Sequence, residues 1–187
     1  MRNMPSNINV LFSGSWSPAN VSVKEIGSTR VIDLALEAKC KRVWDAMLIE
    51  AAQTKRKLWD SDIYRFESMD SGGKKLNLSF STIPFSIRLG MNMHTNEIKK
   101  LGTIYAPQGI FTSCFVRTAD NMCIFIEKSQ YYFTHKKISF IGGVVSRSER
   151  MLTNGRDLFE EARKEIQEEI GVRIGVTNHL HIQVGYR

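Results

Sequence analysis

The stretch KEIQEEIGV, residues 164–172, decides the fold of this chain. At roughly 100° per residue, its three glutamates gather on one side of a helix and its two isoleucines on the adjoining side. Carboxylates at this spacing repel each other by a few tenths of a kcal/mol per pair. The glycine near the end of the stretch is a typical helix stop. The sequence therefore predicts a short helix, over residues 158–170, with one acidic and one apolar face.

Two interpretations of the acidic face are open. An acidic helix face is most often simply exposed to solvent and binds nothing. A divalent cation such as Mg²⁺, which prefers oxygen ligands, would instead remove the repulsion between the carboxylates. The surrounding sequence favours a cation, because the strand-like residues 138–141 precede Gly142-Gly143, Glu149 follows in a loop, and the helix comes next.

This order of strand, Gly-Gly, loop with a glutamate, and helix closed by glycine resembles the Nudix box. Over residues 142–172 the chain is therefore similar to the Nudix hydrolases. The resemblance implies an α/β/α sandwich and Mg²⁺-dependent hydrolysis, with Mn²⁺ as a possible substitute. The substrate class it implies is a nucleoside diphosphate linked to another group.

Carried over by position, the resemblance implies specific roles in the box. Glu165 and Glu169 are the implied metal ligands, and Glu168 joins them directly or through water. The carbonyl of Gly142 completes the implied ligand set, since glycine lets the backbone approach a metal closely. Lys164 belongs to the implied catalytic group as the residue that positions a carboxylate.

Two departures from the family pattern affect this site. Lys164 stands where the family usually has arginine. The compact ammonium of lysine therefore replaces a planar guanidinium, which can bind a carboxylate through two hydrogen bonds. The loop of residues 150–156 is longer than usual and is predicted to lie at the surface. Glu149 is expected to orient this loop or to bind a cation. Asp157 is predicted to be the N-cap of the helix, with Glu160 as its capping-box partner.

The N-terminal half adds a finer resemblance. Val43-Trp44-Asp45, Leu58-Trp59-Asp60 and Ile87-Arg88-Leu89-Gly90 resemble the Nudix subgroup that cleaves UDP-glucose and UDP-galactose to UMP and sugar 1-phosphate. That subgroup normally has a histidine and an acidic residue after the Gly-Gly pair. This chain has Val144-Val145 there, which weakens the prediction of a UDP-sugar.

Three substrate contacts follow from the finer resemblance, each with a simpler alternative. Trp59 would pack on the nucleotide base, or it is a core residue. His94 would lie near the uridine, or it caps a helix. Lys128 would contact the diphosphate, or it is an exposed charge.

The elements divide the chain into an N-terminal α/β region, residues 1–105, and a partial Nudix domain, residues 106–187. Apolar spacing predicts a helix within 31–53, and turn residues separate predicted strands at 64–67 and 76–81. The sequence further predicts two short strands within 8–27, a strand over 85–89, a helix over 95–100 capped by Thr95, a hairpin over 110–127, and a strand over 179–186. Few residues follow the box, so the sandwich is expected to be incomplete at its C-terminus, or completed by the N-terminal half.

Composition limits the function classes. The 187 residues are 42% hydrophobic and carry a formal charge of +7, but the basic residues are scattered, so a nucleic-acid partner is unlikely by sequence. No apolar run approaches the roughly 20 residues of a membrane span. The cysteines, Cys40, Cys114 and Cys123, have no CxxC spacing and are expected to be reduced, as in a cytoplasmic protein.

Three functions remain open from sequence. The first is a Mg²⁺-dependent Nudix pyrophosphatase with a nucleotide-sugar substrate. The second is a Nudix-fold module that binds a nucleotide with little catalysis. The third is a basic RNA-associated protein. The oligomeric state is not predicted.

Overall fold

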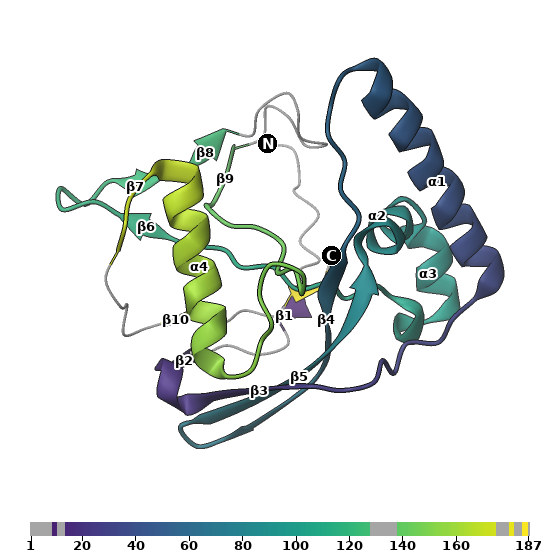
Figure 1. Cartoon of the computed structure of the whole chain (residues 1–187). Coiled ribbons are helices and arrows are strands. Elements are labelled where there is room, and N and C mark those ends of the chain that lie inside the picture. Colours follow the sequence, from purple (N-terminus) through teal and green to yellow (C-terminus); the bar gives the residue numbers. More distant parts are fainter. Residues whose placement is uncertain (1–8, 11–13, 128–137, 175–179, 182–184, 187) are drawn as a thin grey trace, which may run out of the picture.

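The protein has a mixed α/β fold, seen in a computed structural model that describes residues 9–10, 14–127, 138–174, 180–181 and 185–186 (Figure 1). Its helices are α1 (Leu34–Gln53), α2 (Phe85–Met93), α3 (Thr95–Leu101) and α4 (Gly155–Ile170), with single 3-10 turns η1 (Pro18–Asn20) and η2 (Thr103–Tyr105). Its strands are β1 (Asn9–Val10), β2 (Ser15–Trp16), β3 (Val21–Glu25), β4 (Asp62–Gly72), β5 (Lys75–Pro84), β6 (Val116–Arg117), β7 (Cys123–Ile124), β8 (Ile126–Glu127), β9 (Ile138–Ser139), β10 (Leu180–His181) and β11 (Gly185–Tyr186).

The main sheet has the strand order β3-β5-β4. Strands β4 and β5 form the predicted antiparallel hairpin, although both are longer than the sequence indicated. Strand β3 joins parallel to β5, with Val21 opposite Leu76. Figure 1 shows α4 on one side of this sheet and α1, α2 and α3 on the other. The layers therefore agree with the predicted α/β class.

Two irregular segments, 109–114 and 141–146, extend the sheet beyond β4. The amide of Tyr64 donates to the carbonyl of Val145 at 3.0 Å, and the amide of Ile110 donates to the carbonyl of Tyr64 at 2.9 Å. Further along, the amide of Thr112 donates to the carbonyl of Gly143 at 2.9 Å. This ladder fixes the Gly-Gly loop against the sheet.

Helix α4 begins three residues before the predicted start, and the predicted cap was wrong. The N-cap is Asn154, whose side chain accepts a hydrogen bond from the amide of Arg156 at 2.9 Å. Asp157 is the partner in this capping box, because its carboxylate accepts from the amide of Asn154 at 3.0 Å. Gly171 closes the helix with φ of 73°, as predicted.

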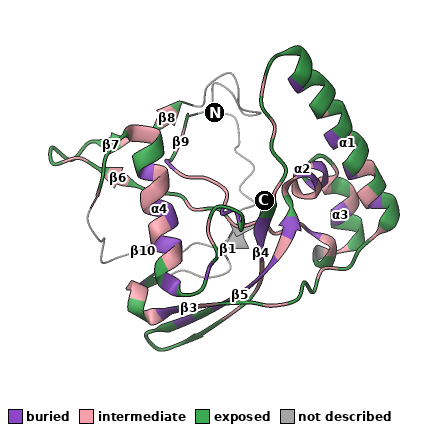
Figure 2. Cartoon of the chain, viewed as in Figure 1, coloured by how far each residue is buried: buried purple, intermediate pink, exposed green. Residues whose placement is uncertain are grey.

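The core lies between α4 and the sheet (Figure 2). Leu158 and Phe159 of α4 pack with Tyr64 and Val145. The first turn of α4 lies against β3, since a Cβ on Gly155 would be 2.1 Å from the carbonyl oxygen of Val21. Glycine is therefore required for α4 to dock this closely.

The strand predicted over 85–89 was wrong, because these residues start helix α2. The amide of Ser86 donates to Asp60 Oδ1 at 2.9 Å, which satisfies a free donor of the first turn. Gly90 then allows α2 to pack tightly on α1, since a Cβ there would be 2.5 Å from the Cα of Cys40. Residues 85–89 alternate between apolar and polar side chains, a pattern typical of a strand, but tertiary packing makes them helical.

The remaining predicted elements are found, and some of them have different bounds. Helix α1 matches its predicted span, and Leu36, Cys40, Trp44 and Ala51 are buried on its apolar face. Helix α3 also matches, but its N-cap is His94 and not Thr95. Strands β6 and β7 pair as the tip of the predicted hairpin. Only short parts of the terminal strands lie within the described residues. No described helix is both long and apolar enough to cross a bilayer.

Candidate functional site

The Gly-Gly loop and the acidic face of α4 meet at two points. The amide of Gly142 donates a hydrogen bond to Glu169 Oε2 at 2.9 Å. The Glu165 carboxylate lies over Gly143, with Oε1 2.2 Å from the place that a Cβ of residue 143 would occupy. Gly142 is sterically required, because its φ is 149° and a Cβ there would lie 2.1 Å from the carbonyl oxygen of Thr112.

Glu165 is a half-buried carboxylate in a negative environment. Burial and the charges of Glu169 and Glu168 raise its pKa to about 7. The charge of Lys164 lowers this pKa in part, but no hydrogen bond or ion pair to Glu165 is found among the described residues. A carboxylate held in this way favours either a proton or a cation beside it.

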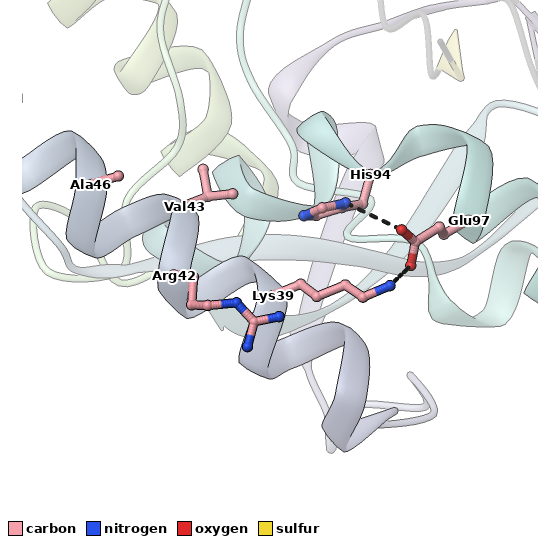
Figure 3. Close-up of a pocket in the computed structure, with 6 residues that line it drawn as sticks. All are labelled: Lys39, Arg42, Val43, Ala46, His94 and Glu97. Carbon is pink, nitrogen blue, oxygen red and sulfur yellow. Dashed lines mark hydrogen bonds and ion pairs between the residues drawn. The ribbon is translucent and has the colours of Figure 1, made fainter.

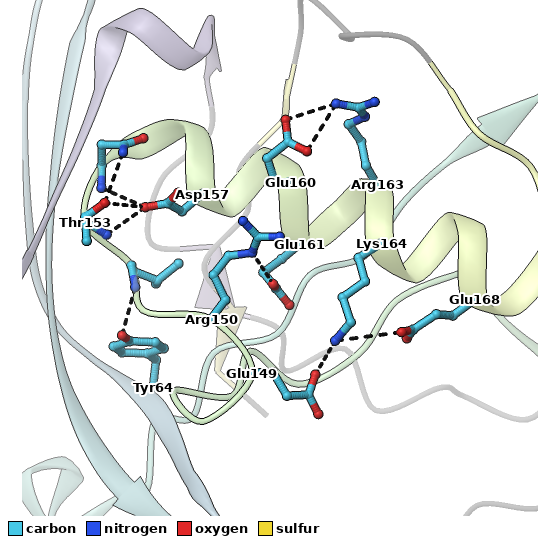
Figure 4. Close-up of polar contacts among 12 residues, drawn as sticks. Tyr64, Glu149, Arg150, Thr153, Asp157, Glu160, Glu161, Arg163, Lys164 and Glu168 are labelled. Atoms are coloured by element: carbon cyan, nitrogen blue, oxygen red, sulfur yellow. Dashed lines mark hydrogen bonds and ion pairs between the residues drawn. The ribbon is translucent and has the colours of Figure 1, made fainter.

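Lys164 and Glu168 lie at the solvent side of the same helix (Figure 4). Lys164 forms an ion pair with Glu149, and its Nζ is 3.8 Å from Glu168 Oε1. Burial alone would lower the pKa of Lys164, but the hydrogen bond to Glu149 and nearby carboxylates raise it. Lys164 therefore holds the loop glutamate against the helix.

A second set of contacts fixes the loop between the glycines and α4. Glu161 is only 2% exposed and accepts a hydrogen bond from Arg150 Nε at 2.6 Å. Tyr64 accepts a hydrogen bond from the amide of Leu152 at 2.9 Å (Figure 4). The long loop is thereby tied to both the helix and the sheet, so its length does not loosen the site.

One neighbour of the acidic face was missed by sequence reasoning. Cys114 Sγ lies 3.4 Å from the carbonyl oxygen of Ala162 in α4. Burial and the charges of Glu165 and Glu169 raise the pKa of the Cys114 thiol to about 11. The predicted hairpin placed Cys114 on a strand, but no sequence signal indicated which element that strand would face.

Two of the predicted substrate-binding residues, Trp59 and His94, lie elsewhere. Trp59, 47% exposed, precedes β4 and stacks on Phe85 with ring centroids 4.5 Å apart, so it is not a core residue. His94 links α2 and α3, with Nδ1 3.5 Å from Glu97 Oε1, and lines a groove beside α1 with Lys39 and Arg42 (Figure 3). No described contact joins either residue to Glu165. Lys128 lies outside the described residues.

The donor chemistry of the acidic face fits a hard divalent cation, because Glu165 and Glu169 supply oxygen ligands beside a glycine backbone. Glu168, in contrast, points to Lys164 (Figure 4). Within the described part of the chain, no three acidic, histidine or cysteine side chains converge on one point as a ready metal site. Glu165 and Glu169 are therefore the two carboxylates that the fold presents to the loop.

Comparison with protein-family models gave no match, and no curated protein matches this chain either.

Proposed function

We propose that this chain is a Nudix-type diphosphatase that hydrolyses a nucleoside diphosphate linked to a second group, with UDP-glucose or UDP-galactose as the leading substrate. The observation that carries the proposal is the joint contact of Gly142 with Glu169 and of Gly143 with Glu165. It brings together the two parts of the sequence on which the family resemblance depends.

Each residue of the proposed site is assigned its own role. Glu165 and Glu169 would hold Mg²⁺, and Glu168 would join them directly or through water. The bound ion neutralises phosphate charge and lowers the pKa of a coordinated water. Gly142 and Gly143 let the loop backbone lie directly against the two carboxylates. Lys164 and Glu149 keep the loop in place, since their ion pair links residues 15 positions apart.

A second candidate is a Nudix-fold module that binds a nucleotide without cleaving it. It is favoured by the orientation of Glu168, which pairs with Lys164 and leaves two carboxylates at the loop. A site with two protein ligands binds Mg²⁺ weakly unless substrate phosphates complete its shell.

Turnover of UDP-glucose with and without Mg²⁺ tests both candidates, with UMP as the measured product. Glu165→Gln and Glu169→Gln are each expected to lower turnover about 100-fold or more, the scale of one lost electrostatic group. Glu160→Gln is the matched control, because Glu160 lies on α4 but pairs with Arg163 at 3.0 Å.

The outcomes separate the hypotheses. UMP formation that depends on Mg²⁺ and on both glutamates supports the diphosphatase. Calorimetric binding of UDP-glucose without product supports the binding module. Full activity in both glutamine variants would move the site away from α4.

A further inference from the structure

Arg88 of α2 is a partly buried cation that has no ion-pair partner among the residues that the structure describes. Burial lowers the pKa of its guanidinium, and no carboxylate of the described residues lies close enough to oppose this. The other partly buried arginines differ. Arg65 pairs with Glu67, and Arg30 pairs with Glu37 at 2.5 Å. An unpaired, partly desolvated guanidinium costs stability, and a bound anion would offset that cost.

The space around Arg88 is made by a glycine on the neighbouring segment. A Cβ on Gly109 would be 2.6 Å from Arg88 Cδ and 2.7 Å from Nε. Gly109 is held in register by a bridge to Arg65 of β4. The stem of Arg88, from Cδ to Nε, therefore packs over bare backbone at Gly109.

Arg88 lies on the face of the sheet opposite α4. Neighbouring residues of a strand point to opposite faces, and Tyr64 faces α4 through the core cluster and Leu152. Ile63 therefore points to the other face, and it lies 3.1 Å from the place of a Gly109 Cβ, next to Arg88. The guanidinium is thus separate from the Glu165 carboxylate.

We propose that Arg88 binds the phosphate group of a small anionic ligand at this second site. A guanidinium presents donors in a planar fork that matches phosphate oxygens in bidentate fashion. A phosphate supplies the missing negative charge and carries more charge than a carboxylate. The site is independent of the proposed diphosphatase activity.

Thermal unfolding with a chelator present tests the site, using inorganic phosphate as the probe and chloride of equal ionic strength as the reference. At ten times its Kd, phosphate is expected to raise the Tm of the wild type by roughly 3 °C. Arg88→Met keeps the stem and should abolish this shift without lowering the Tm in chloride. Arg88→Lys should retain a smaller shift.

Two control variants sharpen the result. Arg147→Met removes an exposed arginine that pairs with Glu25 at 3.0 Å, and it should keep the phosphate shift. Glu165→Gln should also keep it, which separates this site from the metal site. An unchanged shift in Arg88→Met would overturn the proposal. An equal shift with acetate would overturn the assignment to phosphate.

A measurement on the wild type covers the case in which Arg88→Met does not fold. An arginine-selective dicarbonyl reagent modifies exposed guanidinium groups, and mass spectrometry of peptides gives the rate at each arginine. Phosphate should slow the modification of Arg88 about threefold or more, relative to Arg147, if most of the site is occupied. Equal slowing at both residues would overturn the proposal.

Discussion

Two carboxylates in different parts of the molecule, Glu67 and Glu165, are removed from water with opposite results. Burial alone would raise the pKa of Glu67, but hydrogen bonds from Arg65, Ser81 and Thr29 lower it to about 2. At Glu165, burial and the neighbouring glutamates act together and raise the pKa to about 7. The sheet satisfies its buried charge internally, whereas the acidic helix leaves its charge to be satisfied from outside.

The largest effect is expected from Glu67→Gln. This change leaves the guanidinium of Arg65, 2% exposed, without its charged partner. Breaking a buried pair in this way costs about 3–5 kcal/mol. Urea denaturation at neutral pH should show this loss, and a variant as stable as the wild type would contradict the structural role of Glu67.

Gly142→Ala should have the next largest effect. Its φ of 149° is unfavourable for alanine, and the new Cβ would lie 2.1 Å from the carbonyl oxygen of Thr112. A cost of about 2–3 kcal/mol is expected from backbone strain of this kind. Gly143→Ala is the comparison, because its Cβ meets only the movable Glu165 carboxylate. Equal costs at the two positions would show that the loop is not held against Thr112.

Glu165→Gln should stabilise the protein above neutral pH by about 1 kcal/mol, because the group is partly solvated and its repulsion is screened. The folded pKa of about 7 lies above the ordinary value of 4.5. The folded state therefore holds its proton longer, and its stability falls as the pH rises from 4.5 to 7. Denaturation at pH 8 should show the gain, and a loss of stability there would contradict the repulsion.

The pH dependence of Glu67 has the opposite sign. Its folded pKa, about 2, lies below the ordinary 4.5. Its contribution is therefore complete above pH 4.5 and is lost as the pH falls towards 2. Unfolding temperatures between pH 2.5 and 6 should fall steeply in the wild type and less steeply in Glu67→Gln. Parallel curves would assign the acid sensitivity to other groups.

The smallest effect concerns added Mg²⁺. If the acidic face binds this ion, 10 mM MgCl₂ should raise the Tm at pH 8 by about 2–3 °C, provided that 10 mM is well above Kd. The rise should be smaller at pH 5.5, where Glu165 holds a proton. A rise of the same size in the Glu165→Gln/Glu169→Gln double variant would place the ion elsewhere.

The sequence predicted the parts of the fold that depend on local pattern. Helix α4 follows from the spacing of Phe159, Ala162 and Ile166, and its end follows from Gly171. The cap of α4 was misplaced because Asn154 and Asp157 are both good capping residues. Only the structure shows that the Asp157 side chain accepts from the amides of Thr153 and Asn154.

Features that depend on distant contacts could not be predicted. The alternation of residues 85–89 suits a strand, and it is the packing of Gly90 on Cys40 that selects a helix. At the candidate site, the carboxylates and glycines were predicted as a group. Their partners in space, Cys114 and Thr112, come from the irregular segment 109–114, which forms backbone hydrogen bonds with residues distant in the sequence.

The docking of Gly155 on Val21 also sets the order of events in biosynthesis. These two residues are 134 positions apart, from the numbering 155 and 21. At about 5–20 residues per second, a ribosome needs roughly 7–27 s to make the chain between them. Strand β3 is thus made well before the helix that docks on it, and the acidic face can reach the sheet only after α4 itself has been made.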